Sequence, residues 1–421
     1  MRKLIFTILV AVAFIAQAAD PTATNYSMSQ CQGSLSPYPI DINPAVYPDS
    51  LVPVYINHVG RHGSRFPASA TNCIKLRQAL LRADSLGTIT PIGRRLAKLN
   101  DMVMELSADQ WGALDSLGIA EQRAIASRLY FNFAPVFISG SKIEAISSYS
   151  PRAMMSMYNF LHQLNRMNNR INFDTSTGRN TSPLMRPFDT DESYAEFRAQ
   201  APWNSAYDEY FATVCPTSAI VRAMGERYPF TDENEARDPA ITQYYVIAGC
   251  AAMGVDAGAS NYFNKEEYNA LWSCFNLRQY LQRTASTISV VPADIAASLL
   301  RDIIDTTDGF IDGTNSAIAN LRFGHAETLM PLLSLMRLRG CYYVTNYFDT
   351  VRQHWCDFNV VPMSANLQLI LFKSTTSGEY YLRVDLNETP IPLRPNSSEI
   401  YLPWNEARRY LQACIPLYLN L

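Results

Sequence analysis

The sequence predicts an α/β fold in which a mostly parallel sheet with flanking helices is interrupted by a mostly α-helical insertion. Short strand-like runs alternate with helical patterning near both ends of the chain, and a long central stretch has helical patterning with little strand signal. Hydrophobic residues make up 48% of the 421 residues, which is enough for a large core and argues against disorder.

The first 18 residues have the pattern of a secretory signal peptide. Arg2 and Lys3 precede an apolar run from Leu4 to Ile15, and small residues follow at Ala16 and Ala18. A membrane anchor is the alternative, but the apolar run is shorter than the ~20 residues that span a bilayer. We therefore expect residues 1–18 to be removed and the protein to be periplasmic or secreted, with no membrane association after cleavage.

The first half of the mature chain alternates between strand and helix patterns. Residues 19–50 are polar and proline-bearing, which indicates an extension along the surface. Strands are expected at residues 51–57 and 142–149, where apolar residues run up to a turn. Helices are expected at residues 75–86, 91–106, 119–133 and 151–167, the last of them opened by Pro151.

The second half contains the insertion and the rest of the sheet. Residues 170–189 read as a loop, and residues 194–304 as helices broken by prolines. Further elements are a strand at 319–323, a helix at 327–339, and a hairpin of 366–372 with 380–386. We expect a Rossmann-like core domain from residues 51–168 and 316–421, with residues 169–315 as the inserted α-helical domain.

The charge balance narrows the function. The formal net charge is −3, and loss of residues 1–18 leaves 33 basic and 38 acidic residues, a net charge of −5. This balance argues against a nucleic-acid groove or a polybasic membrane surface. An anionic ligand must therefore be bound by a local cluster of positive side chains.

The eight cysteines are scattered, without a C-x-x-C pair. In an exported protein an even number of cysteines suggests structural disulfides, although buried free thiols remain an alternative. The spacing indicates neither a zinc site nor a redox dithiol.

A basic motif directly follows the first predicted strand. Arg61-His62-Gly63-Ser64-Arg65-Phe66-Pro67 lies where ligands bind in open α/β sheets, beyond the carboxyl end of a strand. Arginines can fork onto phosphate oxygens, and histidine can act as a nucleophile. A zinc site formed by His58 and His62 at helical spacing is an alternative, but the preceding strand and the glycines disfavour a helix there.

A second motif follows the third predicted strand. Gly324-His325-Ala326-Glu327 opens a helix, whose free N–H groups can face an anion. His325 is placed to contact a phosphoryl group, and Glu327 is placed to give a proton to a leaving oxygen. A third segment, Ser147-Ser148-Tyr149-Ser150-Pro151-Arg152, follows the second predicted strand.

The first motif resembles the R-H-G-x-R-x-P signature of the histidine acid phosphatases, the branch of the histidine phosphatase superfamily that includes phytases. His-Ala-Glu, in place of the more usual His-Asp, resembles the multiple inositol polyphosphate phosphatase subgroup, as does Lys75-Leu76-Arg77-Gln78. The resemblance covers residues 51–340 and is sharp only at the three motifs.

The resemblance implies a phosphomonoesterase that acts on inositol polyphosphates through a phosphohistidine, without metal or cofactor. His62 is the expected nucleophile and Glu327 the expected acid. The resemblance also implies a role for Arg152, which would complete a phosphate cradle. The cradle residues are expected to be Arg61, Arg65, Arg152 and His325.

Two questions stay open from the sequence. Arg179 and Arg186, in the loop before the insertion, are candidates for contacts to extra phosphates, although a solvated loop arginine is the simpler interpretation of each. The alternatives to a phytase-like enzyme are a broad acid phosphatase for sugar or nucleotide phosphates, and a non-catalytic phosphate-binding protein.

Overall fold

The computed structural model describes residues 26–39, 42, 45–137 and 141–419. The expected signal peptide, residues 1–18, lies outside the described residues. None of the helices in the described part of the chain combines the length and apolar character needed to cross a bilayer.

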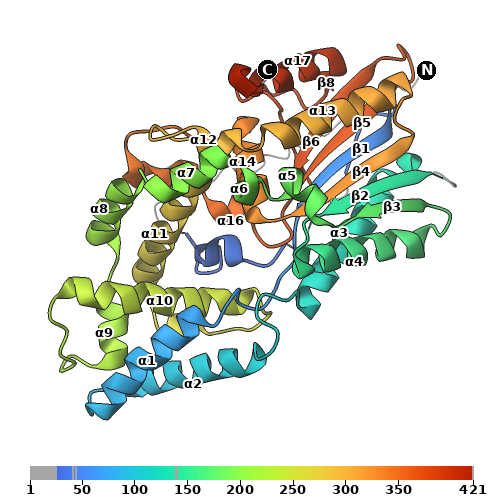
Figure 1. The fold of residues 1–421 in the computed structure, drawn as a ribbon. Helices are drawn as coiled ribbons and strands as arrows, with labels where there is room; N and C mark the ends of the chain where they lie inside the picture. Colours follow the sequence, from blue (N-terminus) through green and yellow to red (C-terminus); the bar gives the residue numbers. More distant parts are fainter. Residues whose placement is uncertain (1–25, 40–41, 43–44, 138–140, 420–421) are drawn as a thin grey trace, which may run out of the picture.

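A single mixed sheet forms the centre of the fold, with the strand order β3-β2-β4-β1-β5-β6-β7 and β8 beside β6 (Figure 1). From β3 to β1 the neighbouring strands are parallel, and from β1 onward they are antiparallel. The α/β class is therefore confirmed, with the parallel half carrying the three sequence motifs. The strands are β1 (Leu51–Arg61), β2 (Lys142–Ser147), β3 (Asn172–Ser176), β4 (Ala317–Gly324), β5 (Asn366–Ser374), β6 (Tyr380–Leu386), β7 (Thr389–Ile391) and β8 (Leu402–Pro403).

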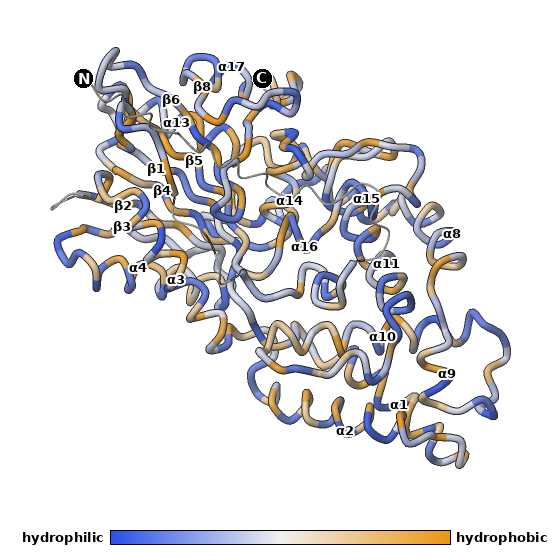
Figure 2. Tube along the Cα trace, turned by 180° about the vertical axis from the view of Figure 1, so that it is seen from behind, coloured by the Kyte–Doolittle hydropathy of each residue, from blue (hydrophilic) through white to orange (hydrophobic). Residues whose placement is uncertain are grey.

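Helices cover both faces of the sheet. On one face α3 (Ser116–Asn132) and α4 (Pro151–Met167) pack against each other, and α4 also packs on β2 and β4. On the other face α13 (Ala297–Asp312) packs on β1 and β4, where Asn57 Nδ2 donates to the Thr307 hydroxyl at 2.8 Å. Figure 2 shows hydrophobic and hydrophilic residues alternating along α2, as in a helix with one buried side. The central strands are thus buried on both faces, as their apolar runs predicted.

A group of helices lies beside the sheet. It contains α1 and α2, which pack against α10 and α9, and α8, which packs against α11 (Figure 1). The helices of this group are α1 (Thr71–Ser85), α2 (Pro91–Leu106), α7 (Glu192–Gln200), α8 (Asn204–Val214), α9 (Ser218–Met224), α10 (Glu233–Ala251) and α11 (Lys265–Arg283). The remaining helices are α5 (Ser182–Met185), α6 (Pro187–Thr190), α12 (Val291–Asp294), α14 (Ala326–Leu335), α15 (Val351–His354), α16 (Asp357–Val360) and α17 (Trp404–Cys414).

Several contacts cross the expected division at residues 168/169 and 315/316. The strand β3 belongs to the sheet, and α13 packs on the sheet at β1 and β4, although both elements fall inside the expected insertion. Conversely, α1 and α2 fall inside the expected core segment but pack on insertion helices. The helical group is therefore assembled from more than one stretch of the sequence.

Two local expectations need correction. Residues 170–189 are not a plain loop, because β3 pairs in parallel with β2 and two short helices follow it. β3 is partly exposed and its residues, NFDTS, do not alternate between buried and exposed positions, so the sequence carried no pattern that predicts a strand there. The extension does more than cover the surface: residues 30–35 form a 3-10 helix, with Cys31, Gly33 and Ser34 buried against α10, α11 and α16.

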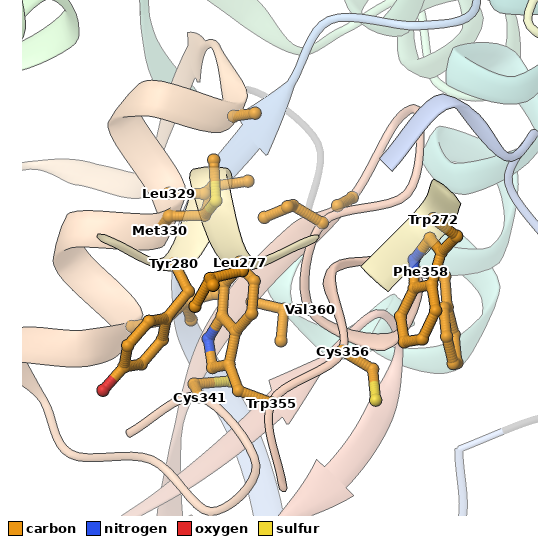
Figure 3. Packing of buried hydrophobic residues seen from close by; sticks show 14 of the residues in the cluster. Trp272, Leu277, Tyr280, Leu329, Met330, Cys341, Trp355, Cys356, Phe358 and Val360 are labelled. Carbon is orange, nitrogen blue, oxygen red and sulfur yellow. The ribbon is translucent and has the colours of Figure 1, made fainter. Parts of the chain in front are cut away.

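One large hydrophobic cluster joins the helical group to the C-terminal segment. Trp272 packs against Phe358 with ring centroids 5.2 Å apart, and Trp355 lies near Tyr280 (Figure 3). Cys341 and Cys356 belong to the same packed cluster.

The structure does not contain the expected disulfides. All eight cysteines are buried, and each has a free thiol. Burial raises the pKa of the Cys250, Cys341 and Cys356 thiols to about 12, which keeps them protonated. They therefore pack as small apolar side chains.

The turn after β1 requires close backbone contact with the start of α3. A Cβ atom on Gly118 would lie 2.2 Å from the Ser64 carbonyl oxygen and 2.7 Å from the Ser64 nitrogen. We expect Gly118→Ala to lower the free energy of unfolding by about 1–3 kcal/mol, the usual cost of overpacking, as measured by urea denaturation.

Gly249, in α10, is the matched control, because a Cβ there meets no atom within 4 Å. Gly249→Ala should leave stability unchanged or raise it by up to about 1 kcal/mol. Equal effects of the two substitutions would contradict the role of the Gly118 contact.

Candidate active site

The three sequence motifs meet at one edge of the sheet. Because β1, β2 and β4 are parallel, their carboxyl ends coincide: Arg61 pairs with Gly324, and Ser147 with Phe323. The side chains after these strands face one cavity of about 580 Å³. Its lining includes the predicted site residues Arg61, His62, Arg65, Arg152 and Glu327.

His62 is buried and its tautomer is fixed by a neighbour. Nδ1 lies 2.9 Å from the Gly63 carbonyl oxygen, and because a carbonyl only accepts, Nδ1 carries the proton. Nε2 is then the ring nitrogen with the lone pair. Burial, followed by the nearby guanidinium groups of Arg61 and Arg152, lowers the pKa of His62 well below its usual value. The imidazole is therefore neutral and able to act as a nucleophile.

His325 lies beside His62, with ring centroids 5.5 Å apart. Its Nε2 is 2.8 Å from Arg186 Nη1 and 2.8 Å from the Ser148 hydroxyl, and its Nδ1 is 3.4 Å from Arg152 Nη2. A guanidinium group only donates and a neutral imidazole has one acceptor nitrogen, so only one of the two arginine contacts can be a hydrogen bond. The shorter contact, from Arg186, makes Nε2 the acceptor and leaves the proton on Nδ1, on the side of Arg152 Nη2. Burial is the main cause that lowers the pKa of His325 to about 3, so this residue offers a neutral N–H donor.

The arginines of the cavity have unused hydrogen-bonding capacity. The buried Nε atoms of Arg61, Arg65 and Arg152 have no hydrogen-bond partner. Burial and mutual repulsion lower the pKa of Arg61 to about 10 and that of Arg65 to about 9. The cavity therefore combines N–H donors with positive charge, and this combination favours binding of a tetrahedral anion such as phosphate.

The N-terminal extension holds Arg61 in place. Arg61 Nη1 donates to the Ser34 and Val361 carbonyl oxygens at 2.6 and 2.5 Å, and the Ser34 amide donates to Asp357 Oδ2 at 2.7 Å. Gly33 has a φ of 62°, and a Cβ there would lie 2.7 Å from that carboxylate oxygen. Only glycine fits this turn without displacing Asp357.

A buried carboxylate supports the loop that follows His62. Glu121 accepts hydrogen bonds from the Ser64 amide at 2.9 Å and from the Ser64 hydroxyl at 2.8 Å. It also accepts from the Tyr38 amide and the Ser364 hydroxyl. One side chain thereby joins the extension, the motif loop and the segment before β5.

Glu327, in the first turn of α14, faces the cavity and pairs with an arginine that the sequence analysis did not single out. Arg283 Nη2 lies 2.9 Å from Glu327 Oε1. Burial is the largest single influence and would raise the pKa of the Glu327 carboxyl. The charge and hydrogen bond of Arg283, with smaller contributions from His325 and a backbone hydrogen bond, together outweigh burial and hold that pKa well below its usual range. Without substrate, the expected acid is therefore ionised.

The two loop arginines have different surroundings. Arg186 reaches His325, pairs with Asp189, and lies 4.9 Å from the centre of the Tyr149 ring. Arg179 is exposed and stacks on the same ring at 4.8 Å. Arg186 is therefore part of the cluster around His325, whereas Arg179 lies over Tyr149.

Sequence reasoning missed several polar contributors to the cavity, among them Ser34, Arg278 and Arg283. The two arginines lie on α11, where polar residues at 278, 279, 282 and 283 recur at helical spacing beside apolar neighbours. This polar stripe was the available signal, but a solvated helix face has the same pattern.

The zinc alternative for His58 has no support in the geometry. His58 is 1% exposed on the extended strand β1, with its ring 5.2 Å from Phe160 and 5.4 Å from Phe323. Among the described residues there is no group of three or more His, Cys, Asp or Glu side chains placed to hold a metal ion.

Comparison with known proteins supports the family resemblance, although no family model matches the sequence. The chain is 23% identical over 398 residues to multiple inositol polyphosphate phosphatase 1 of Gallus gallus, covering 87% of this chain and 84% of that protein. It is 25% identical over 381 residues to the Homo sapiens protein of the same name, covering 83% and 77%. The resemblance to the histidine acid phosphatases is confirmed.

Solved structures show the same fold. The Bifidobacterium longum multiple inositol polyphosphate phosphatase in complex with phosphate has a TM-score of 0.77 at 18% identity, covering 92% of this chain and 98% of that one. The phytase from D. castellii has a TM-score of 0.73 at 17% identity, covering 93% and 86%. Both solved structures therefore share the arrangement of sheet and helices described above.

The buried neutral histidines predict how the stability of the unliganded protein depends on pH. Burial lowers the pKa of His58 and of His325 to about 3 and lowers that of His62. Below the unfolded value of ~6.5 the unfolded chain binds protons that the folded protein does not. The free energy of unfolding should therefore fall as pH drops from 6.5 to 5, by up to about 1.4 kcal/mol per pH unit for each histidine.

Urea denaturation between pH 5 and 7.5 measures this slope. His58→Phe keeps a ring between Phe160 and Phe323 but removes one titrating group, so the slope should decrease by about one histidine's share. An unchanged slope would show that His58 takes up protons in the folded protein as it does in the unfolded chain, contrary to the prediction.

Proposed function

We propose that this protein is a phosphomonoesterase that hydrolyses inositol polyphosphates, phytate above all, through a phosphohistidine intermediate. The observation that carries the proposal is the neutral His62, whose Nε2 lone pair is free in a cavity lined by guanidinium groups. A neutral nucleophile beside concentrated positive charge fits attack on a phosphate ester.

In the first step His62 Nε2 attacks phosphorus while the bond to the alcohol oxygen breaks. Arg61, Arg65 and Arg152 bind the equatorial oxygens, and His325 donates from Nδ1. Phosphoryl transfer depends mainly on such positioning and charge stabilisation. Glu327, protonated at this stage, transfers its proton to the leaving oxygen.

In the second step water attacks the phosphohistidine and the N–P bond breaks. The Glu327 carboxylate accepts a proton from this water, so the same side chain acts first as acid and then as base. The arginines supply the positive charge, so neither step calls for a metal ion or cofactor.

The cavity supports a polyphosphorylated substrate over a small sugar phosphate. It has a volume of about 580 Å³, and Arg278 and Arg283 lie on α11, outside the cradle. A second solved structure of the Bifidobacterium longum phosphatase is a complex with inositol hexasulfate, an analogue with several anionic groups. We expect the site of a sugar phosphatase to be narrower.

Export is part of the proposal. Residues 1–18 have the signal-peptide pattern described above, which supports a periplasmic or secreted enzyme. N-terminal sequencing of the exported protein tests the cleavage site.

The first functional test is phosphate release from phytate. We expect the wild-type protein to release phosphate equally with and without a chelator, and His62→Ala to lose at least about 1,000-fold in kcat because the nucleophile is gone. Acid-quench labelling with a radioactive phosphate donor should give an acid-labile label that is absent in His62→Ala.

Good activity on glucose phosphates with none on phytate would favour the broad acid phosphatase. Phosphate binding without turnover of any ester would favour the non-catalytic protein.

A second test concerns Glu327. Glu327→Gln removes the acid, so hydrolysis of phytate should slow by about 100- to 10,000-fold. Aryl phosphates, whose leaving groups need no proton, should be affected much less in their phosphorylation step. Equal losses on the two substrate types would exclude Glu327 as the acid.

A further inference from the structure

Glu327 must be protonated to act as an acid, yet the unliganded site favours its ionised form. The Arg283 guanidinium pairs with the carboxylate at 2.9 Å, and both side chains are partly open to the cavity, at 18% and 35% exposure. An opposite charge at this distance stabilises the carboxylate.

The other groups that interact electrostatically with Glu327 come from several elements. They are Arg61 at the end of β1, Arg65 in the loop after it, Arg152 on α4, His325 before α14, and Tyr194 on α7. The three arginines belong to the cradle, where the negative charge of a bound phosphoryl group would offset most of their positive charge. Arg283 is the cation that stays beside Glu327 after the cradle is filled.

Arg283 also has capacity for a second anion. It ends α11 at the cavity wall, next to Gln282 and one turn beyond Arg278 and Gln279. Its buried Nε has no hydrogen-bond partner. An anionic group adjacent to the reacting phosphate can therefore compete with Glu327 for this guanidinium.

We propose that Arg283 is a specificity-determining residue that links binding of a neighbouring phosphate group on the substrate to protonation of Glu327. This inference rests on the proposed function. When the second phosphate takes the guanidinium, Glu327 loses its partner and binds a proton from solvent. That proton passes to the leaving oxygen as the Nε2–P bond forms and the P–O bond breaks.

The same exchange prepares the second step. Once the dephosphorylated alcohol leaves, Arg283 is free to pair again with the Glu327 carboxylate. The ionised carboxylate then accepts the proton of the water that attacks the phosphohistidine. An alkyl monophosphate has no second anion to engage Arg283, so it meets Glu327 in the ionised form and reacts slowly.

The test compares the pH dependence of kcat/KM for phytate and for glycerol 2-phosphate in the wild type and in Arg283→Gln. With the monophosphate, loss of Arg283 should move the alkaline limb upward by about one pH unit, the effect of removing an adjacent opposite charge. Activity on the monophosphate near pH 6.5 should rise while activity on phytate falls, so their ratio should drop by at least about 10-fold. A purely structural role would not increase any rate.

Two variants serve as controls. Arg283→Lys keeps the positive charge and should keep the alkaline limb within about 0.3 pH units of the wild type. Arg278→Gln lies on the same helix and lines the same cavity, so it should raise KM for phytate without moving that limb.

An unmoved limb in Arg283→Gln, or proportional losses on both substrates, would overturn the inference. Failure of the wild type to hydrolyse phytate would instead overturn the proposed function.

Discussion

Several arginine side chains share one buried cavity, and the surrounding structure offsets the cost of keeping them there. Burial and like-charge repulsion both disfavour charged guanidinium groups. Arg61 is compensated by the carbonyls of Ser34 and Val361, Arg65 by the Phe66 carbonyl, and Arg283 by Glu327. The compensation is incomplete, because the Nε atoms of these arginines keep no partner. The remaining capacity is what an anion would use.

Long-range packing keeps this arrangement in register. Asp357 binds the Ser34 amide through one carboxylate oxygen and the Trp272 indole N–H through the other, at 2.9 Å. Trp272 in turn packs on Phe358 in the core shown in Figure 3. The N-terminal extension, the helical group and the C-terminal segment therefore all contribute to the position of Arg61, although each is remote from it in sequence.

The parts of the site that sequence predicted are those whose signal is local. At Arg61-His62 a few consecutive residues predict both the end of a strand and the phosphate chemistry that follows it. The parallel pairing of the strands then brings the three motifs to one edge of the sheet. Arg283 carries no such signal, because its partner Glu327 is reached only through packing of α11 beside α14. The contact of Arg186 with His325 and the pairing of β3 with β2 are likewise products of tertiary structure. The cysteines show where sequence reasoning fails. Their even number suggested disulfides, but the fold buries each thiol without a disulfide partner.

Because the formal net charge is −3, the protein as a whole does not attract a polyanion, and the attraction must come from the side chains inside the cavity. Solvent and salt screen exposed charges strongly but buried ones much less, so a few guanidinium groups in a low-dielectric cleft can outweigh an acidic exterior. The same low dielectric makes the protonation of any carboxyl group in the cleft sensitive to each neighbouring charge. Glu327 sits in that environment with a single direct cationic partner among the described residues, Arg283. Substrate binding and proton transfer are therefore not independent properties of this site, because every anionic group that enters the cavity changes the charge balance that sets the protonation of Glu327.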